Sequence, residues 1–191
     1  MSIEILSEVN HRFAQARAHH REQADLFWFL ALPGYAMLHE KQLAEESLTQ
    51  RRLKRFMLLE SPQMTYDVIP EDAGVLQPLV GSKKRTELLP DDRWSIIKRS
   101  FTDYLRWENN TLKAYELAAK RLFEHGCIAA YEFVIEIIRD VAEEVRMVDD
   151  MVVALSGMEW DLPTITDQQD RIAAEYEKKI KKLYKGRRLD D

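Results

Sequence analysis

Apolar residues recur every three or four positions along most of this chain, which is the pattern of amphipathic α-helices. The apolar positions of residues 2–31 follow this spacing from the first turn: Ile3, Leu6, Val9 and Phe13. Pro33-Gly34 then ends the first segment, because proline cannot continue a helix and glycine permits a turn. A second periodic segment covers residues 35–60. Two long helices joined by so short a break predict an antiparallel hairpin.

The second half of the chain repeats this arrangement after a different kind of segment. Residues 61–91 contain four prolines and two glycines and keep no helical period. Two further periodic segments follow, residues 93–124 and residues 127–155. A long connection inside a compact domain needs a reason, and a crossover along a bundle supplies one. The pattern therefore predicts an all-α fold, a four-helix bundle with one long crossover at about residues 61–91.

A shorter helix and a basic end complete the chain. Thr166 and Gln169 have the spacing of a capping box, which predicts a helix start at Thr166. The stretch from Lys178 to Arg188 is strongly basic. We expect residues 1–160 to form the bundle and residues 161–191 to add a C-terminal helix with a basic tail.

Composition narrows the class of protein. A net charge of −5 and a pI near 5.6 argue against a nucleic-acid-binding protein, except for weak attraction through the basic tail. The single cysteine, Cys127, excludes an intramolecular disulfide and fits a reducing cytosol. The most apolar early stretch, Leu26 to Leu32, is far shorter than the ~20 residues that span a bilayer. We therefore expect a soluble, cytoplasmic protein without a signal peptide.

Acidic residues interrupt the apolar stripes of these helices. Glu46 and Glu108 lie on the stripes of the second and third helices, and Glu144 borders the seam of the fourth. Burying an unpaired carboxylate is costly, so an inward glutamate predicts a partner or a cation. Carboxylates suit iron, and several of them on facing helices can bridge two irons.

The positions of these acids along the hairpins provide a second criterion. Glu108 and Glu144 are each 18 residues from the glycine that separates their helices, and Glu22 and Glu46 are each 12 residues from Gly34. Residues equally distant from the turn of an antiparallel hairpin lie at the same height. The spacing therefore predicts four carboxylates, one from each helix, that converge at mid-bundle.

Two other candidates compete for this site. His20 lies on the better-defined stripe of the first helix, where it is either a metal ligand or a buried, hydrogen-bonded histidine. Glu143 shares a mostly polar stripe that is typical of a solvated face, and it is kept as an additional metal candidate beside Glu144. Three further histidines are expected on the surface or in loops: His19, His39 and His125.

Parts of both hairpins resemble the ferritin-like superfamily, which includes ferritins, bacterioferritins and Dps-type mini-ferritins. Tyr104–Ala118 is similar to the third ferritin helix with its metal-binding glutamate, and Asp140–Met147 is similar to the fourth. Trp28 and Leu32–Glu40 resemble the turn region of mini-ferritins. The likeness covers roughly residues 10–156, and its motifs are of low specificity.

This resemblance implies a carboxylate-bridged di-iron protein of the ferroxidase type, which binds iron(II) and reacts with O2 or peroxide. The sequence departs from that pattern, because Thr49, Arg146 and Met147 stand where glutamate-x-x-histidine motifs would place histidines. Phe27 likewise stands where mini-ferritins have a ligand histidine. The alternative function is therefore a metal-free helical module for assembly or partner binding, in which the metal site has been lost.

Aromatic residues carry two further expectations. Trp28, Trp107 and Trp160 exceed what one core absorbs, and exposed apolar surface of that kind predicts a homo-oligomer. Tyr104 and Tyr115 lie on the same helical face as the candidate glutamate between them, where they serve as packing or as an electron relay. The sequence does not distinguish iron storage from detoxification or from oxidation of an organic substrate.

Overall fold

The computed structural model describes residues 2–60 and 79–185, and the side chains of residues 2–59 and 79–176. Its helices are α1 (Ser2–Phe29), α2 (Pro33–Glu60), the short 3-10 helix η1 (Arg85–Glu87), α4 (Pro90–Glu124), α5 (Ile128–Gly157) and α6 (Leu162–Lys185). These ranges contain no strand, which confirms the all-α prediction. Most of the predicted crossover falls in residues 61–78 and lies outside the described residues.

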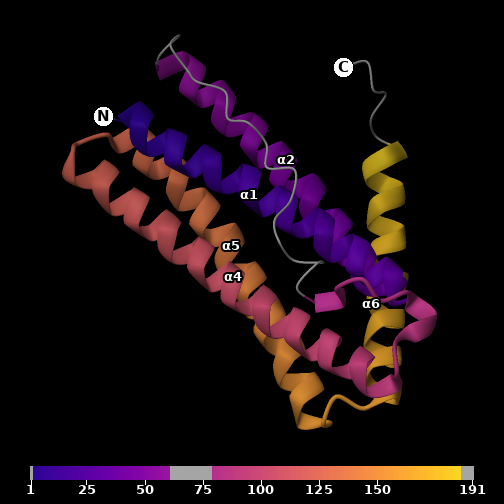
Figure 1. Cartoon of the computed structure of the whole chain (residues 1–191). Coiled ribbons are helices and arrows are strands. Elements are labelled where there is room, and N and C mark those ends of the chain that lie inside the picture. Colours follow the sequence, from indigo (N-terminus) through magenta and orange to yellow (C-terminus); the bar gives the residue numbers. More distant parts are fainter. Residues whose placement is uncertain (1, 61–78, 186–191) are drawn as a thin grey trace.

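The helices form two antiparallel hairpins that pack side by side (Figure 1). α1 packs along α2, α4 packs along α5, and α1 also lies against α4. α6 packs against α2 at the end of the bundle where α1 turns into α2 (Figure 1). Within the described ranges, no helix is both long enough and apolar enough to cross a membrane.

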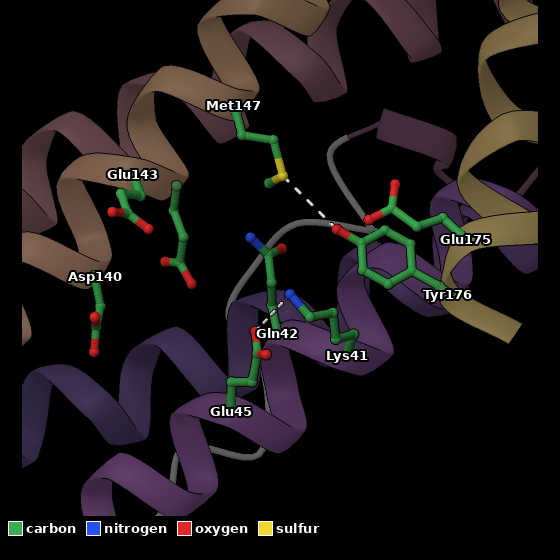
Figure 2. A pocket seen from close by; sticks show the side chains of 9 residues that line it. Lys41, Gln42, Glu45, Asp140, Glu143, Met147, Glu175 and Tyr176 are labelled. Carbon is green, nitrogen blue, oxygen red and sulfur yellow. Dashed lines mark hydrogen bonds and ion pairs between the residues drawn. The ribbon is translucent and has the colours of Figure 1, made fainter. Parts of the chain in front are cut away.

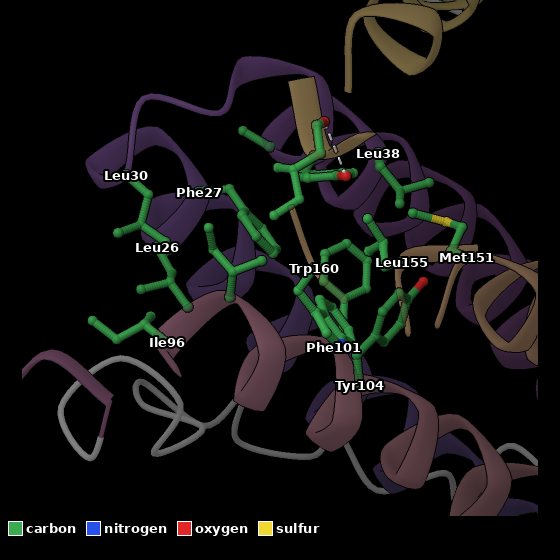
Figure 3. Packing of buried hydrophobic residues seen from close by; sticks show 14 of the residues in the cluster. Leu26, Phe27, Leu30, Leu38, Ile96, Phe101, Tyr104, Met151, Leu155 and Trp160 are labelled. Carbon is green, nitrogen blue, oxygen red and sulfur yellow. Dashed lines mark hydrogen bonds between the residues drawn. The ribbon is translucent and has the colours of Figure 1, made fainter. Parts of the chain in front are cut away.

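The core consists of two apolar clusters at opposite ends of the bundle. One cluster surrounds the α1–α2 turn and contains Phe27, Phe101, Leu155 and Trp160 (Figure 3). The other joins the start of α1 to the turn between α4 and α5, with Leu122 at its centre. In α1, α2 and α4, the residues between the two clusters include buried polar side chains, and α5 adds the partly buried Glu144. The bundle therefore has a polar layer between two apolar ends.

α6 is fixed to α2 by a close backbone approach. A Cβ atom on Gly34 would lie 1.8 Å from the carbonyl oxygen of Gln169, so only glycine fits there. The Gly34 N–H donates to Gln169 Oε1 at 3.2 Å, and the Tyr35 hydroxyl donates to Gln168 Oε1 at 2.8 Å. Gly34 is therefore required for the close contact with α6, whereas the residues before it form the α1–α2 turn.

The predicted start of the last helix is wrong. α6 begins at Leu162, because Asp161 accepts hydrogen bonds from the backbone N–H of Thr164 at 2.9 Å and from its hydroxyl at 2.8 Å. An aspartate that bonds the first turn in this way is a typical helix N-cap. Thr166 lies inside the helix, and Gln169 is the buried contact of α6 with α2.

The tryptophans are less exposed than expected. Trp160 belongs to the apolar cluster at the α1–α2 end, and Trp107 is partly buried. Only Trp28 of the three has a largely exposed ring, at 45%, and its indole N–H donates to Glu40 at 2.8 Å. The aromatic argument for an oligomer therefore rests on Trp28 alone.

Candidate functional site

Two buried carboxylates stand at the centre of the polar layer. Glu46 on α2 is 6% exposed and Glu108 on α4 is 1% exposed, so both are inward, as the stripes predict. Glu46 Oε2 and Glu108 Oε1 have no hydrogen-bond partner among the described residues. Burial raises the pKa of both carboxyls well above the usual value, and the charge of Glu144 raises both further. Three helices thus bring three acidic groups within electrostatic reach of one another.

Glu144 lies at the edge of this layer. It is partly buried on α5, and burial, followed by the charge of Glu45, raises the pKa of its carboxyl to about 7. Lys41 opposes that shift by favouring the charged form. Glu144 therefore lies between the buried carboxylates and a surface pocket, and it can titrate near neutral pH.

Two buried histidines, one from α1 and one from α2, complete the layer. His20 and His39 are fully buried, and their Nδ1 atoms lie 3.1 Å apart. His20 Nε2 lies 3.5 Å from Glu108 Oε1, so His20 stands between His39 and the carboxylate. Burial lowers the pKa of both imidazoles well below the usual value, and both are neutral. One of the two Nδ1 atoms therefore carries a proton and donates a hydrogen bond to the other.

The expectation that His39 and His19 lie on the surface is wrong. His39 is 0% exposed and His19 is 5% exposed. The signal for His39 was present, because His39, Gln42 and Glu46 follow one another at three- and four-residue steps on one face of α2. That face is polar over these turns and apolar only at its ends, so an apolar stripe did not reveal it. His125 is exposed, as predicted.

Neutral polar side chains form hydrogen bonds with one another around the acidic centre of the layer. The Tyr104 hydroxyl donates to Gln42 Oε1, next to the histidine pair. At one end of the layer the Ser100 hydroxyl donates to Gln23 Oε1 at 2.5 Å. At the other end Gln50 Nε2 donates to Asn10 Oδ1 at 3.1 Å. These bonds place amides and hydroxyls on nearly every turn around the acidic centre.

Arginines lie near the carboxylates without pairing with them. Arg12 and Arg17 both lower the pKa of Glu46, by less than burial raises it. Arg12 instead donates to the Thr111 hydroxyl from Nε and Nη2, at 3.0 and 2.9 Å, and Arg17 donates to Gln50 at 2.9 Å. Within the described residues, no arginine forms an ion pair with the buried glutamates at the centre of the layer, so their charge is not neutralised by a salt bridge.

The outer side of the layer, between α1 and α4, is closed by a ring stack. The His19 ring lies parallel to the Trp107 indole at 4.7 Å, and Arg12 lies 4.0 Å from the centre of the same indole. His19 and Arg12 are seven residues apart on α1, about two helical turns, so they hold the indole between them. Burial lowers the pKa of His19 to about 3, which keeps its imidazole neutral.

Two predicted site residues lie elsewhere. Glu22 is only half-buried, and its neighbour Gln23 takes the fully buried position on α1. His20 contacts His39, and Asn10 contacts Gln50, so residues 29–30 lie midway along the chain between the residues that α1 and α2 bring together. By the same pairing, the residue of α1 at the height of Glu46 lies near position 14. Counting from Gly34 placed Glu22 at the wrong height. Glu143 is exposed on α5 and faces the surface pocket.

That pocket opens between α2, α5 and α6 and has a volume of about 620 Å³ (Figure 2). Its walls carry Lys41, Gln42 and Glu45 from α2, Asp140, Glu143, Glu144 and Met147 from α5, and Glu175 and Tyr176 from α6. Gln42 and Glu144 belong to both the pocket and the polar layer. The pocket therefore borders the polar layer at Gln42 and Glu144.

The donor atoms of the layer fit a metal in chemistry, although they do not converge on one point. Among the described side chains, no three His, Cys, Asp or Glu groups are arranged to hold a metal ion. Carboxylate oxygens and imidazole nitrogens are nonetheless the donors that suit iron. Several of these buried atoms lack a hydrogen-bond partner in the described part of the chain, namely Glu46 Oε2, Glu108 Oε1, His20 Nε2 and His39 Nε2. Buried polar atoms without partners point to a missing ion or water.

Known structures share this architecture, although no protein-family model matches the chain and no curated protein matches its sequence. An open-pore ferritin from Archaeoglobus fulgidus superimposes with a TM-score of 0.73 at 15% identity, over 90% of this chain and 95% of that one. A variant of the ferritin PmFTN, soaked in iron, superimposes with a TM-score of 0.70 at 11% identity, over 88% and 96% of the two chains. The chain therefore has the ferritin-like fold, which confirms the fold that the sequence predicts.

Proposed function

We propose that this ferritin-like bundle binds iron(II) in its polar layer and reacts the iron with O2 or peroxide. The observation that carries the proposal is the pair of buried carboxyls, Glu46 and Glu108, which interact electrostatically and have unpartnered oxygens without an arginine ion pair among the described residues. Burying such groups destabilises a fold, so their presence calls for a cation. Iron is the substrate here, and at this site it would supply one electron per ion to the oxidant.

The ligands proposed for iron come from all four helices of the bundle. Glu46, Glu108 and Glu144 supply oxygens, and His20 supplies a nitrogen, with His39 as an addition that the sequence did not suggest. Binding requires small rotations of these side chains, because they do not yet converge. The buried carboxyls would release their protons as the cation enters, since a nearby positive charge lowers a carboxyl pKa.

The acidic pocket supports the same function as an entrance. Iron(II) would be attracted by the carboxylates at its mouth, including Glu143, and pass to Glu144 at its inner wall. Tyr104 and Tyr115 have buried hydroxyls beside the glutamates and are placed to donate hydrogen bonds or electrons. We also propose a homo-oligomer, since the resemblance to ferritins implies assembly and Trp28 offers an exposed apolar face.

A metal-free assembly module is the second candidate. It is favoured by Thr49 in place of a ligand histidine, and by the contact between His20 and His39, which pairs one ring nitrogen of each imidazole with the other. In that case the bundle keeps a polar layer that binds water rather than iron.

Anaerobic titration with iron(II), followed by metal analysis of the protein, tests the two candidates. Iron should bind the native chain and be lost in Glu108→Gln, which keeps the size of the side chain and removes its charge. Glu132→Gln is the matched control, because Glu132 is exposed on α5 and lies outside the layer and the pocket. Native protein that takes up no iron would favour the metal-free module. Glu108→Gln protein that takes up as much iron as the control would contradict the proposed site.

A further inference from the structure

We propose that the pocket between α2, α5 and α6 binds a linear aliphatic polyamine, a flexible chain with several ammonium groups. This ligand differs from iron, and the inference does not rest on the proposed iron chemistry. A pocket of about 620 Å³ is within the range of small-molecule sites and far larger than a metal ion.

Charge on the walls favours a ligand with several positive groups. Five carboxylate side chains line the pocket, from three different helices, and Lys41 is the cation among the described residues that line it. Lys41 lies 2.9 Å from Glu45 and pairs with it, whereas Asp140 and Glu143 form no ion pair among the described residues. Because the lining acids come from three helices, the negative charge is distributed along the pocket. Distributed charge matches an extended polycation better than a single ion.

A buried amide gives independent support for a ligand. Gln42 is 1% exposed, yet it lines the pocket, and its Nε2 has no partner among the described residues (Figure 2). Its other amide atom accepts the hydrogen bond from Tyr104. The carbonyl oxygen has two lone pairs, of which the Tyr104 hydroxyl uses one. The second lone pair would accept a hydrogen bond from a bound ammonium group.

The remaining wall suits the methylene chain of such a ligand. Tyr176 and Met147 contact each other, with the Tyr176 hydroxyl 3.8 Å from the Met147 sulfur. Lys41 Nζ already lies 5.1 Å from the centre of the Tyr176 ring, so this ring accepts a cation. In Figure 2 the labelled side chains of the three helices surround a common space, with the acids of α5 opposite Tyr176. The pocket thus combines separated anions with an aromatic and thioether surface.

The test is calorimetric titration of the full-length chain with spermine and with putrescine. Spermine should bind about tenfold more tightly than putrescine, because it carries more ammonium groups, and raising the salt concentration should weaken it more steeply. The double variant Asp140→Asn/Glu143→Gln should weaken spermine binding by about tenfold, while the matched control Glu132→Gln should leave it unchanged. Tyr176→Leu should weaken binding more than Tyr176→Phe, which keeps the ring.

Three results would overturn the inference. One is no binding of spermine, or binding no tighter than that of putrescine. Another is equal weakening by Glu132→Gln and by the pocket variant, which would indicate general attraction to an acidic protein. The third is displacement of spermine by Mg²⁺ at an ionic strength where NaCl has no effect, which would assign the pocket to a metal. Spermine binding that persists in Glu108→Gln protein separates this site from the iron site, whichever way the iron test ends.

Discussion

The polar layer and the apolar clusters on either side of it are built from the same helices and lead to opposite expectations. In the clusters, side chains such as Phe101 and Leu122 are buried among carbon atoms and stabilise the fold in proportion to the area they bury. In the layer, Glu46 and Glu108 are equally buried, but their carboxyls lose water and gain no counter-charge. Burial alone therefore does not show what a residue contributes to stability. The clusters stabilise the bundle, whereas the buried acids of the layer lower its stability.

Removing a large side chain from a cluster should have the largest effect. Phe101 is 1% exposed, and its ring centre lies 4.9 Å from that of Tyr35 and 5.6 Å from that of Phe27. Phe101→Ala should therefore lower the free energy of unfolding by about 3–5 kcal/mol. Chemical denaturation of the metal-free protein measures this. Val153→Ala, at an exposed position on α5, should change the value by less than about 0.5 kcal/mol. Similar losses at both positions would contradict the contrast.

The same measurement on the layer should change in the other direction. Glu108→Gln should raise the free energy of unfolding by about 1–3 kcal/mol in the absence of metal, since it removes a buried acid that lacks a partner. Glu132→Gln should have no measurable effect, because Glu132 is exposed. A loss of stability in Glu108→Gln would mean that the carboxyl stabilises the native fold as a hydrogen-bonding group.

The pH dependence of the metal-free protein should show both kinds of titrating group in the layer. The three buried histidines have lowered pKa values, so below about 6.5 the unfolded chain binds protons that the folded chain does not, and stability falls as the pH decreases. The three glutamates have raised pKa values, Glu144 to about 7, so above about 4.3 the folded chain retains protons that the unfolded chain releases. The contribution of these glutamates to the free energy of unfolding therefore falls as the pH rises.

Between these two limits the opposing contributions offset each other, so we expect a broad maximum of stability from about pH 4.3 to 6.5 and a decline on both sides. Thermal unfolding at a series of pH values measures the curve. The double variant Glu46→Gln/Glu108→Gln should flatten the decline above about pH 6.5. Its stability should rise from about pH 4.3 to 6.5, because two of the three glutamates no longer offset the histidines. Stability that increases from pH 6.5 to 8 in the native protein would show that the glutamates are ionised in the fold.

The smallest effect is expected where α6 meets the bundle. Tyr35→Phe removes a hydroxyl that donates to Gln168 and leaves the ring in its cluster, so it should cost about 1 kcal/mol. Gly34→Ala should disturb the contact between α2 and α6 more than Tyr35→Phe does, because the added Cβ would overlap the Gln169 backbone. Loss of α6 contacts, measured by hydrogen exchange, should follow Gly34→Ala and not Tyr35→Phe.

The sequence predicted the helices well, because apolar spacing is a local property that burial then enforces. It also predicted that Glu108 and Glu144 interact, and the charge of Glu144 does act on Glu108; Gly126, with φ of 70°, lies in the turn between their helices. In the first hairpin the same reasoning failed. Ala31, with φ of 60°, carries the turn, and Pro33 already begins α2. An alanine in the left-handed region has no sequence signal, so the height of Glu22 was misjudged.

The polar partners of the site were harder to predict for a related reason. His39 lies where the face of α2 changes from the apolar Tyr35 to the polar Gln42 and Glu46, and its burial depends on α1 packing against that face. Tertiary contacts of this kind leave no periodic mark. The pocket is similarly absent from any local pattern, because its three walls come from residues 41–45, 140–147 and 175–176.

The attachment of α6 also bears on the order in which the chain folds. The two hairpins join neighbours in sequence, whereas Gly34 and Gln169 are separated by most of the chain, and contacts of such long range close late. The bundle and its polar layer can therefore form during synthesis before α6 has left the ribosome. The pocket becomes complete only when the last helix docks, so a ligand bound there would report that the whole chain has finished folding.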